Sequence, residues 1–473
     1  MWCAVCVPRL AQWLLPCSGG PVQVSHTPFR LSQSIKHMSA ARSLAETVAA
    51  INRGETSCEA VTRACLDRIA TREPVVRAWI DFDPDHALTQ ARALDATTSS
   101  GVPAQVLRGI PVGVKDVFDT FDLPSRYGSP IYAAHRPAAD AAVVARVRAL
   151  GGSVLGKTVT TEFATFTPNV TTNPHNAAHT PGGSSSGSAA AVAAGMVPVA
   201  FGTQTIGSVI RPAAYCGVVG YKPTFGLLSR VGVKAISDCL DTVGCFTRSV
   251  ADAAFFVGAL AGRPFALASS GASAAPRIGL CLTAQWPQAQ PETQQLFSAL
   301  GARLSQAGAA VADVTLPSLY DGINPAQDII AAVEMEACLI DERRRFPHLL
   351  SERLRLRLDE GAGITADAYD AALALARQCR GRFATDIAAC DVLVVPSCQG
   401  EAPRGLASTG DPVFNRTWSL LHTPAVHVPL TTGPNGLPLG VQVVGRIGED
   451  ARTLAVAHWI ETRLRERVTG TPG

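Results

Sequence analysis

The stretch Gly182–Pro223, GGSSSGSAAAVAAGMVPVAFGTQTIGSVIRPAAYCGVVGYKP, decides how this chain is interpreted. It opens with three serines, continues through a segment of small residues and reaches a second Gly-Ser turn at Ser208. Upstream, the apolar run Gly109–Val114 ends at Lys115. A serine nucleophile needs a base within reach and donors that hold the developing oxyanion. A lysine and two serines on separate loops therefore predict a hydrolase with a serine nucleophile and no histidine base.

The segments around this stretch alternate between helical and extended patterns. Capping boxes at Ser43–Glu46 and Thr56–Glu59 precede apolar residues at helical spacing, and Asp140 and Asp450 are expected to cap two further helices. The block 325–388 is expected to be helical. Helix-then-strand alternation favours a mostly parallel or mixed sheet wrapped by helices. The predicted strands are Trp79–Phe82, Ile110–Val114, Ser153–Gly156, Val197–Gly202, Ile278–Leu282, Ala309–Leu316, Asp391–Pro396 and Leu439–Val444, and Val218–Tyr221 is a further short apolar run.

The domain organisation follows from where this alternation begins. Residues 1–38 have neither a helical nor a strand period, and we interpret them as an N-terminal extension that is poorly ordered or not native. A targeting segment and a structural arm are the alternatives. Ala268–Ala275 is the best linker candidate, but the late strands are expected to rejoin the main sheet. We therefore expect a single α/β domain over residues 39–473, with a large mixed β-sheet core surrounded by helices.

The composition excludes several classes of protein. Charged residues make up 17% and hydrophobic residues 47% of the chain, which is typical of a compact globular protein. The net charge is +3 and no block of Lys and Arg occurs, so no nucleic-acid partner is expected. No apolar run reaches the roughly 18–20 residues of a membrane helix. Thirteen irregularly spaced cysteines predict free thiols in the reducing cytoplasm, with no metal site and no cofactor.

Lys115 can act as a base only when it is neutral. An ordinary lysine has a pKa near 10.4, so about one in a few thousand is neutral at pH 7. Burial beside hydroxyl groups and away from carboxylates lowers that pKa. Because adjacent strand residues point to opposite faces, Asp116 is expected to lie outside the pocket of Lys115. His175 and His179, the histidines nearest the serines, are expected to be ordinary polar loop residues.

The segment Gly202–Ser208 follows a predicted strand and is built from small residues. Its successive N–H groups can face one point and form a nest for an anion, with Ser208 placed to attack a carbonyl carbon. A plain strand-to-loop turn is the alternative. Ser185 also fits the G-x-S-x-G nucleophile elbow, but that elbow needs a preceding strand, and Asn173–Pro181 has the composition of a loop.

In order and spacing these residues resemble the amidase signature family of serine hydrolases, from about Ser43 to the end of the chain. The resemblance implies the amidase signature fold and amide hydrolysis through an acyl-enzyme, with no metal or cofactor. The pieces that carry it are Gly109–Pro111, Val114–Asp116, Gly156–Thr158, Glu162–Phe163, the stretch Gly182–Pro223 and Gly436–Gln442.

The resemblance also implies a role for each site residue. In the family a Ser–cis-Ser–Lys triad carries the reaction, so Lys115 is expected to be the base, Ser184 the bridging serine in a cis peptide and Ser208 the acylated nucleophile. The 24-residue interval between the two serines matches the family motif. Ile206 replaces the glycine or alanine of many relatives, so its bulk bears on the substrate range. The implied oxyanion hole consists of the N–H groups of Thr205, Ile206, Gly207 and Ser208.

Two further runs, Ser208–Pro212 and Ala407–Pro412, resemble bacterial malonamidase-like amidases. There the equivalent arginine binds a substrate carboxylate, so Arg211 is a candidate substrate-binding residue. The alternative is a structural arginine that pairs with a carbonyl or an aspartate.

We expect from these observations a cytoplasmic amidase that hydrolyses a small-molecule amide to an acid and ammonia or an amine. It is expected to have no nucleic-acid or membrane partner, and at most a second copy of itself in a homodimer. The alternative is the glutaminase component of a glutamyl-tRNA amidotransferase, its A subunit, with partner chains. The run Thr203–Thr205 and the malonamidase-like C-terminal part favour the free-standing enzyme. A non-catalytic binding scaffold is a third class, which the complete set of triad residues disfavours.

Overall fold

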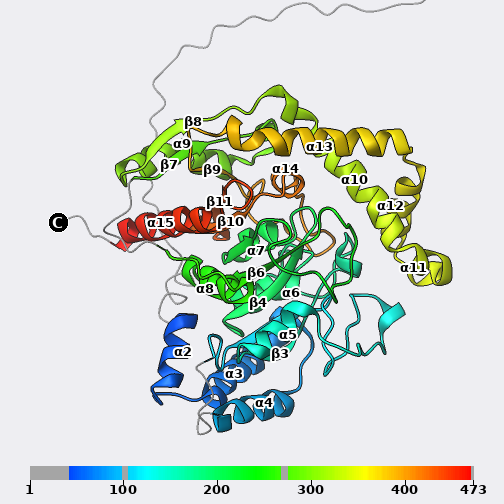
Figure 1. Ribbon diagram of the computed structural model, residues 1–473, viewed down its shortest axis with the longest axis vertical. Helices are drawn as coiled ribbons and strands as arrows, with labels where there is room; N and C mark the ends of the chain where they lie inside the picture. The colour runs from blue at the N-terminus through cyan, green and yellow to red at the C-terminus, as the bar shows by residue number, and fades with distance from the viewer. Residues whose placement is uncertain (1–41, 98–104, 268–274, 470–473) are drawn as a thin grey trace, which may run out of the picture.

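The computed structural model describes residues 42–97, 105–267 and 275–469. Within them the strands form one eleven-stranded sheet in the order β1-β3-β2-β4-β6-β5-β10-β11-β9-β7-β8, with helices on both faces (Figure 1). Parallel pairs join β2 to β3 and β4, and β7 to β8 and β9, while the other neighbours are antiparallel. The predicted mixed α/β sheet is confirmed. The strands are β1 (Trp79–Asp81), β2 (Pro111–Lys115), β3 (Ser153–Thr158), β4 (Val199–Gln204), β5 (Val219–Lys222), β6 (Thr242–Thr247), β7 (Arg277–Leu280), β8 (Ala310–Asp313), β9 (Val392–Pro396), β10 (Ala425–Thr432) and β11 (Pro438–Val444).

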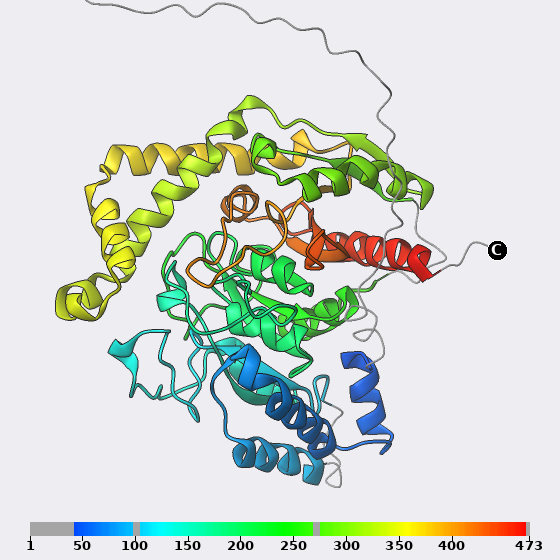
Figure 2. The same ribbon diagram turned by 180° about the vertical axis from the view of Figure 1, so that it is seen from behind.

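The helices fall into two layers and one projecting group. The helices α10 to α13 form the projecting group, here called the helical arm (residues 323–386), which extends beyond the sheet in both views (Figures 1 and 2). None of the described helices has the length and apolar character of a transmembrane span. The helices are α2 (Leu44–Asn52), α3 (Cys58–Val76), α4 (Pro84–Ala96), α5 (Ala142–Ala149), α6 (Ser186–Ala193), α7 (Ile210–Cys216), α8 (Val250–Ala261), α9 (Pro291–Gln306), α10 (Ile323–Cys338), α11 (Ile340–Arg345), α12 (Glu352–Gly363), α13 (Ala366–Asp386), α14 (Arg416–Leu420) and α15 (Asp450–Thr469).

Alternation along β4 explains how both faces of the sheet are covered. Val199 and Phe201 pack into the core that includes α8 and α15, whereas Ala200 packs into the core that includes α6 and α7. Successive strand residues point to opposite faces, so a strand buried on both faces is apolar at nearly every position. This central position carries β4 and its following loop into the interior of the molecule.

Helix α6 lies unusually close to the sheet because it is built from small residues. A Cβ atom added to Gly187 would lie 2.2 Å from the carbonyl oxygen of Ala78 and 2.4 Å from the amide nitrogen of Val159. Only glycine fits such an approach of backbone to backbone. The close packing places the serines that precede α6 directly beside the ends of the central strands.

The structure corrects several expectations about single elements. The pattern does not predict β6 or β10, which contain Gly244 and Pro429 among their buried residues. The N-cap of α3 is Ser57 rather than Thr56, because the Ser57 side chain accepts a hydrogen bond from Ala60 N. The capping box at Ser43 is confirmed.

The two aspartates expected to cap helices have other partners. Asp140 does not cap α5; its carboxylate accepts a hydrogen bond from Phe121 N and pairs with Arg148. Asp450 is the first residue of α15, and its carboxylate accepts hydrogen bonds from Tyr221 and Thr224. Residues 1–38, interpreted above as an N-terminal extension, lie outside the described residues. The same holds for most of the linker candidate at 268–275.

Replacing Gly187 by alanine is expected to lower the free energy of unfolding by about 1–3 kcal/mol, because the added methyl group forces α6 away from the sheet. Gly381 on α13 is the matched control, since a Cβ there would meet no atom within 4 Å. Gly381→Ala is expected to stabilise the protein by about 0.5–1 kcal/mol. Urea denaturation of both variants measures the two changes, and equal effects would contradict the close-packing argument.

Candidate active site

The side chain of Lys115 is fully buried at the end of β2 and is held by two hydroxyl groups. Its Nζ lies 2.9 Å from Ser184 Oγ and 2.8 Å from Thr203 Oγ1. Burial lowers the pKa of the Lys115 ammonium to about 7, while the carboxylate of Asp241 opposes that shift. A lysine in this setting is substantially neutral near pH 7 and can accept a proton from a hydroxyl group.

The neighbouring carboxylate is directed elsewhere. Asp116 Oδ1 lies 3.0 Å from Lys157 Nζ on β3, and the same carboxylate accepts a hydrogen bond from Arg126 N. Lys157 also donates to Phe118 O and Ser125 Oγ. A second buried lysine thus engages the carboxylate of Asp116, which leaves Lys115 with hydroxyl partners.

The serine loop before α6 is anchored by Arg211. The peptide bond between Gly183 and Ser184 is cis. Nη2 of Arg211 donates to Gly183 O at 2.7 Å and its Nη1 donates to Gly410 O at 2.7 Å. Arg211 lines the cavity described below, but its guanidinium has the carbonyl partners that the structural alternative expects.

The loop 205–208, here called the oxyanion loop after the role that the sequence resemblance implies for it, connects β4 to the turn before α7. All four of its residues are buried. Within the described chain, none of their backbone N–H groups donates to a protein acceptor. Backbone N–H groups of buried residues are usually paired, so four neighbours without a protein acceptor form a candidate site for a ligand oxygen.

Side chains on both sides hold this loop open. The Gln204 side chain accepts hydrogen bonds from Val209 N and Ile210 N, and it donates to Ser419 Oγ. Ser419 Oγ in turn donates to Ile206 O at 2.7 Å. A Cβ at Gly207 would lie 2.5 Å from Asn415 Oδ1, so a side chain at this position would displace the loop.

A cavity of about 290 Å³ opens onto the oxyanion loop. Ser208 and Ile206 line it, together with Arg353 from α12 and Asp411 from the loop before α14. The cavity wall also includes Arg211, Thr205, Phe166, Ile236, Met335 and Arg416. The structure therefore brings Lys115 and Ser184 into direct contact and places Ser208 in the cavity wall. No direct hydrogen bond joins Ser208 to Ser184 among the described side chains.

Several residues of this site are not identified from the sequence. Thr203 holds the Lys115 amine and Gln204 shapes the oxyanion loop; both lie in the Thr-Gln-Thr run, whose position after a strand is the available signal. Arg353 comes from a distant segment that no local pattern connects to the serines, and Asp411 lies in the run Ala407–Pro412, where nothing marks the aspartate as a site residue. His175 and His179 hydrogen-bond to the carbonyl groups of Cys216 and Ala402, as expected for structural loop residues.

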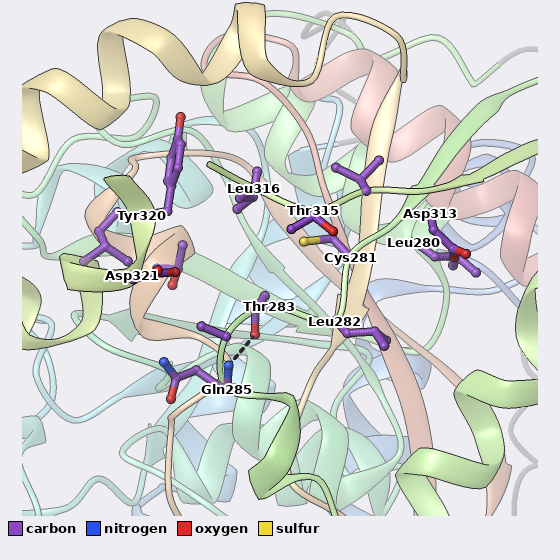
Figure 3. A pocket seen from close by; sticks show the side chains of 14 residues that line it. Leu280, Cys281, Leu282, Thr283, Gln285, Asp313, Thr315, Leu316, Tyr320 and Asp321 are labelled. Atoms are coloured by element: carbon purple, nitrogen blue, oxygen red, sulfur yellow. Dashed lines mark hydrogen bonds between the residues drawn. The ribbon is translucent and has the colours of Figure 1, made fainter. Parts of the chain in front are cut away.

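Other features of the structure lie apart from this cavity. A second cavity of about 420 Å³ sits at the carboxyl ends of β7 and β8, and Figure 3 shows Leu280, Cys281, Asp313 and Tyr320 around it. Its described lining includes none of the predicted site residues. Over residues 42–97, 105–267 and 275–469, no three His, Cys, Asp or Glu side chains gather closely enough to hold a metal ion.

Comparison with known proteins gives a consistent family. The model of the Amidase family matches residues 60–454. The A subunit of glutamyl-tRNA(Gln) amidotransferase from Oleidesulfovibrio alaskensis is 33% identical, over 90% of this chain and 97% of the relative. The corresponding protein of Acidothermus cellulolyticus is 35% identical, over 90% and 95%. A crystal structure of an amidase superposes with a TM-score of 0.82 at 28% identity, covering 89% of this chain and 100% of that one.

These relatives correct two expectations. The free-standing amidase for a small-molecule amide is wrong as the leading prediction, because the curated relatives along nearly the whole chain carry the name of an amidotransferase component. For the same reason, the expectation of no protein partner beyond a second copy is wrong. The predicted closer resemblance to malonamidase-like amidases is also not supported, because these relatives are amidotransferase A subunits.

The enzyme class itself stands. The family model, the shared fold and the named relatives agree on an enzyme that acts on carbon–nitrogen bonds of amides. This chain therefore belongs to the amidase signature family.

Proposed function

We propose that this chain is the glutamine-hydrolysing component of a glutamyl-tRNA(Gln) amidotransferase, which acts with partner chains. The observation that carries the proposal is the identity of 31–35% to proteins of that name, over 86–90% of the chain. A cytoplasmic location is part of the proposal. It is supported by the ten cysteines of the described chain, all of which are free thiols.

The proposed reaction begins with neutral Lys115. Lys115 accepts a proton from Ser184 as Ser184 accepts one from Ser208, and Ser208 Oγ attacks the side-chain amide carbon of glutamine. The N–H groups of the oxyanion loop hold the developing negative charge. The proton returns along the relay to the leaving nitrogen, which departs as ammonia. Water then hydrolyses the glutamyl ester by the same relay, so glutamine and water yield glutamate and ammonia.

The charges in the cavity fit an amino acid substrate. Arg353 is exposed, lies over the Phe166 ring and has no carboxylate partner among the described side chains. Asp411 is likewise exposed, and no hydrogen bond or ion pair engages its carboxylate among the described side chains. We assign Arg353 to the α-carboxylate of glutamine and Asp411 to its α-ammonium, because each group then meets the opposite charge. We assign Arg211 to holding Gly183 and the serine loop.

Ser208→Ala is expected to reduce glutamine hydrolysis at least about a thousandfold, because no acyl-enzyme forms without the nucleophile. Labelling by a fluorophosphonate probe should disappear in parallel. Ser186→Ala is the matched control on the same serine-rich motif and should keep both. Normal turnover by Ser208→Ala would contradict the assignment of the nucleophile.

The pH dependence of kcat/KM should show an acidic limb near pH 7, since the base form of Lys115 is populated above its lowered pKa. Thr203→Val removes the hydroxyl group that orients the amine and should lower the alkaline plateau by about tenfold, a part of the 10²–10⁴ that a general base supplies. Thr203→Ser keeps the hydroxyl and should retain the plateau. A profile flat from pH 5 to 9 would argue against lysine as the base.

Arg353→Ala is expected to raise KM for glutamine by about tenfold or more, because a hydrogen-bonded charge pair contributes about 1.5–3 kcal/mol. The KM for propionamide, which lacks a carboxylate, should not change. Arg355→Ala alters an exposed arginine of the same helix outside the cavity lining and serves as the control. An equal effect on both amides would remove the assignment of Arg353.

The amidotransferase role is tested directly by transamidation. The chain purified from its own cells should copurify with partner subunits, and that preparation should form Gln-tRNA(Gln) from Glu-tRNA(Gln) and glutamine. Ser208→Ala should lose glutamine-dependent transamidation but keep the reaction driven by added ammonium. A chain that purifies alone and supports no transamidation would contradict the proposal.

A further inference from the structure

Asp241 is a buried carboxylate without a salt-bridge partner in the described structure. Its Oδ1 accepts a hydrogen bond from Thr205 Oγ1, and its Oδ2 accepts hydrogen bonds from Ile236 N at 2.9 Å and Ser237 N at 3.1 Å. The residue is 5% exposed. Burying an ionised group is costly unless it is well hydrogen-bonded, so a carboxylate kept in such a place calls for a role.

The position of Asp241 in the sheet indicates that role. The antiparallel pairing of β4 with β6 runs up to Gln204 opposite Thr242. The next residues in that register are Thr205 and Asp241, and there the backbone ladder stops. The bond between their side chains continues the pairing where the backbone bonds end. It therefore fixes the start of the oxyanion loop without engaging the N–H of Thr205.

The helical arm secures the segment that carries Asp241. Glu334 on α10 accepts hydrogen bonds from Ser237 Oγ and from Cys239 N, the latter at 3.1 Å. Tyr369 on α13 donates to the other oxygen of Glu334 at 2.8 Å. These contacts connect the arm, through the segment 236–241, to the loop that faces the reacting carbonyl.

The same two parts of the chain also contribute to the cavity wall. Ile236 lies in the segment held by Asp241, and Met335 follows Glu334 on α10. Ile236 and Met335 line the cavity together with Ser208. A displacement of the arm would therefore change the oxyanion loop and the cavity wall together.

We propose that Asp241 is a positioning residue, which fixes Thr205 and thereby the free N–H groups of the oxyanion loop, and that Glu334 on the helical arm holds Asp241 in place. The inference rests on the proposed function of the loop 205–208 as the oxyanion hole. Asp241 touches neither Lys115 nor the cavity, so its effect reaches the reaction through Thr205 and through its charge.

The Thr205 variants test the positioning role without altering a charge. Thr205→Val keeps the shape and removes the hydroxyl group, and should lower kcat for glutamine by about tenfold to a hundredfold with KM within about twofold, because misplaced oxyanion donors act on the transition state. Thr205→Ser keeps the hydroxyl group, so its kcat should be close to that of the wild type. Wild-type kcat in Thr205→Val, or no rescue by serine, would overturn the proposal.

The Asp241→Asn variant supplies a readout that a merely structural role would not move. The negative charge of Asp241 favours protonated Lys115, and Arg230 is the cation that acts on Asp241 itself. Removing that charge should shift the acidic limb of kcat/KM to lower pH. Asp252→Asn, which alters a buried carboxylate on α8 bonded to Leu44 N, is the control and should leave the limb in place. If the acidic limb of kcat/KM lies at the same pH in Asp241→Asn as in the wild type, the result counts against the proposal. If Asp241→Asn does not fold, the comparison of Thr205→Val with Thr205→Ser decides.

The arm is tested by Glu334→Ala, which should lower kcat about threefold to tenfold, in the range of coupling through a packed network. Glu336→Ala on the same helix removes an ion pair with Arg343 and should not lower kcat. Equal effects of the two variants would remove Glu334 from the scheme. The wild-type chain distinguishes failure of the proposed function from failure of the role of Asp241. If the wild type neither hydrolyses glutamine nor reacts with a fluorophosphonate, the proposed function fails. If the wild type and Thr205→Val are equally active, only the role of Asp241 is overturned.

Discussion

The amine of Lys115 lies in a fully buried position where its partners are the hydroxyl oxygens of Ser184 and Thr203. Burial disfavours the ammonium, so the amine becomes a usable base near neutral pH. The surrounding structure serves this requirement. Small residues let α6 bring Ser184 against β2, and Lys157 engages the carboxylate of Asp116. If that carboxylate faced Lys115, it would stabilise the ammonium and remove the base.

A second constraint concerns backbone groups that must remain unpaired. The N–H groups of a β-strand normally bond to a neighbouring strand, but those of the four loop residues after β4 have no acceptor within the described part of the chain. Side chains replace the missing backbone bonds. Gln204 ties the loop to the start of α7, Ser419 holds Ile206 O, and Asp241 holds Thr205. The loop is held in place because polar side chains outside it make the bonds that the ladder no longer supplies.

The parts of the site that could be predicted from sequence are those encoded locally. Lys115 at a strand end and two serines at a fixed interval lie in short runs, and the alternating segments indicate the mixed sheet. Arg353 and Asp241 could not be predicted because the loop residues that they lie beside in the site, Ser208 and Thr205, are more than thirty residues away in sequence. Asp140 lies in a capping pattern but has stronger partners in Arg148 and Phe121. The prediction of a free-standing enzyme rested on the run Thr203–Thr205 and on the malonamidase-like C-terminal part, features too short to outweigh similarity along nearly the whole chain.

The division of labour between the sheet and the helical arm has a consequence for how such enzymes diverge. The groups assigned to bond breaking come from the sheet and its serine loop, whereas Met335 and Arg353 enter the cavity from the arm. Replacements of the cavity-lining residues of the arm can thus alter which amide is accepted while the proton relay stays untouched, as long as Glu334 keeps its contacts with the segment 236–241. A lineage can explore new substrates in one segment and preserve its chemistry in another, which is a route for a single scaffold to yield many amide-cleaving enzymes.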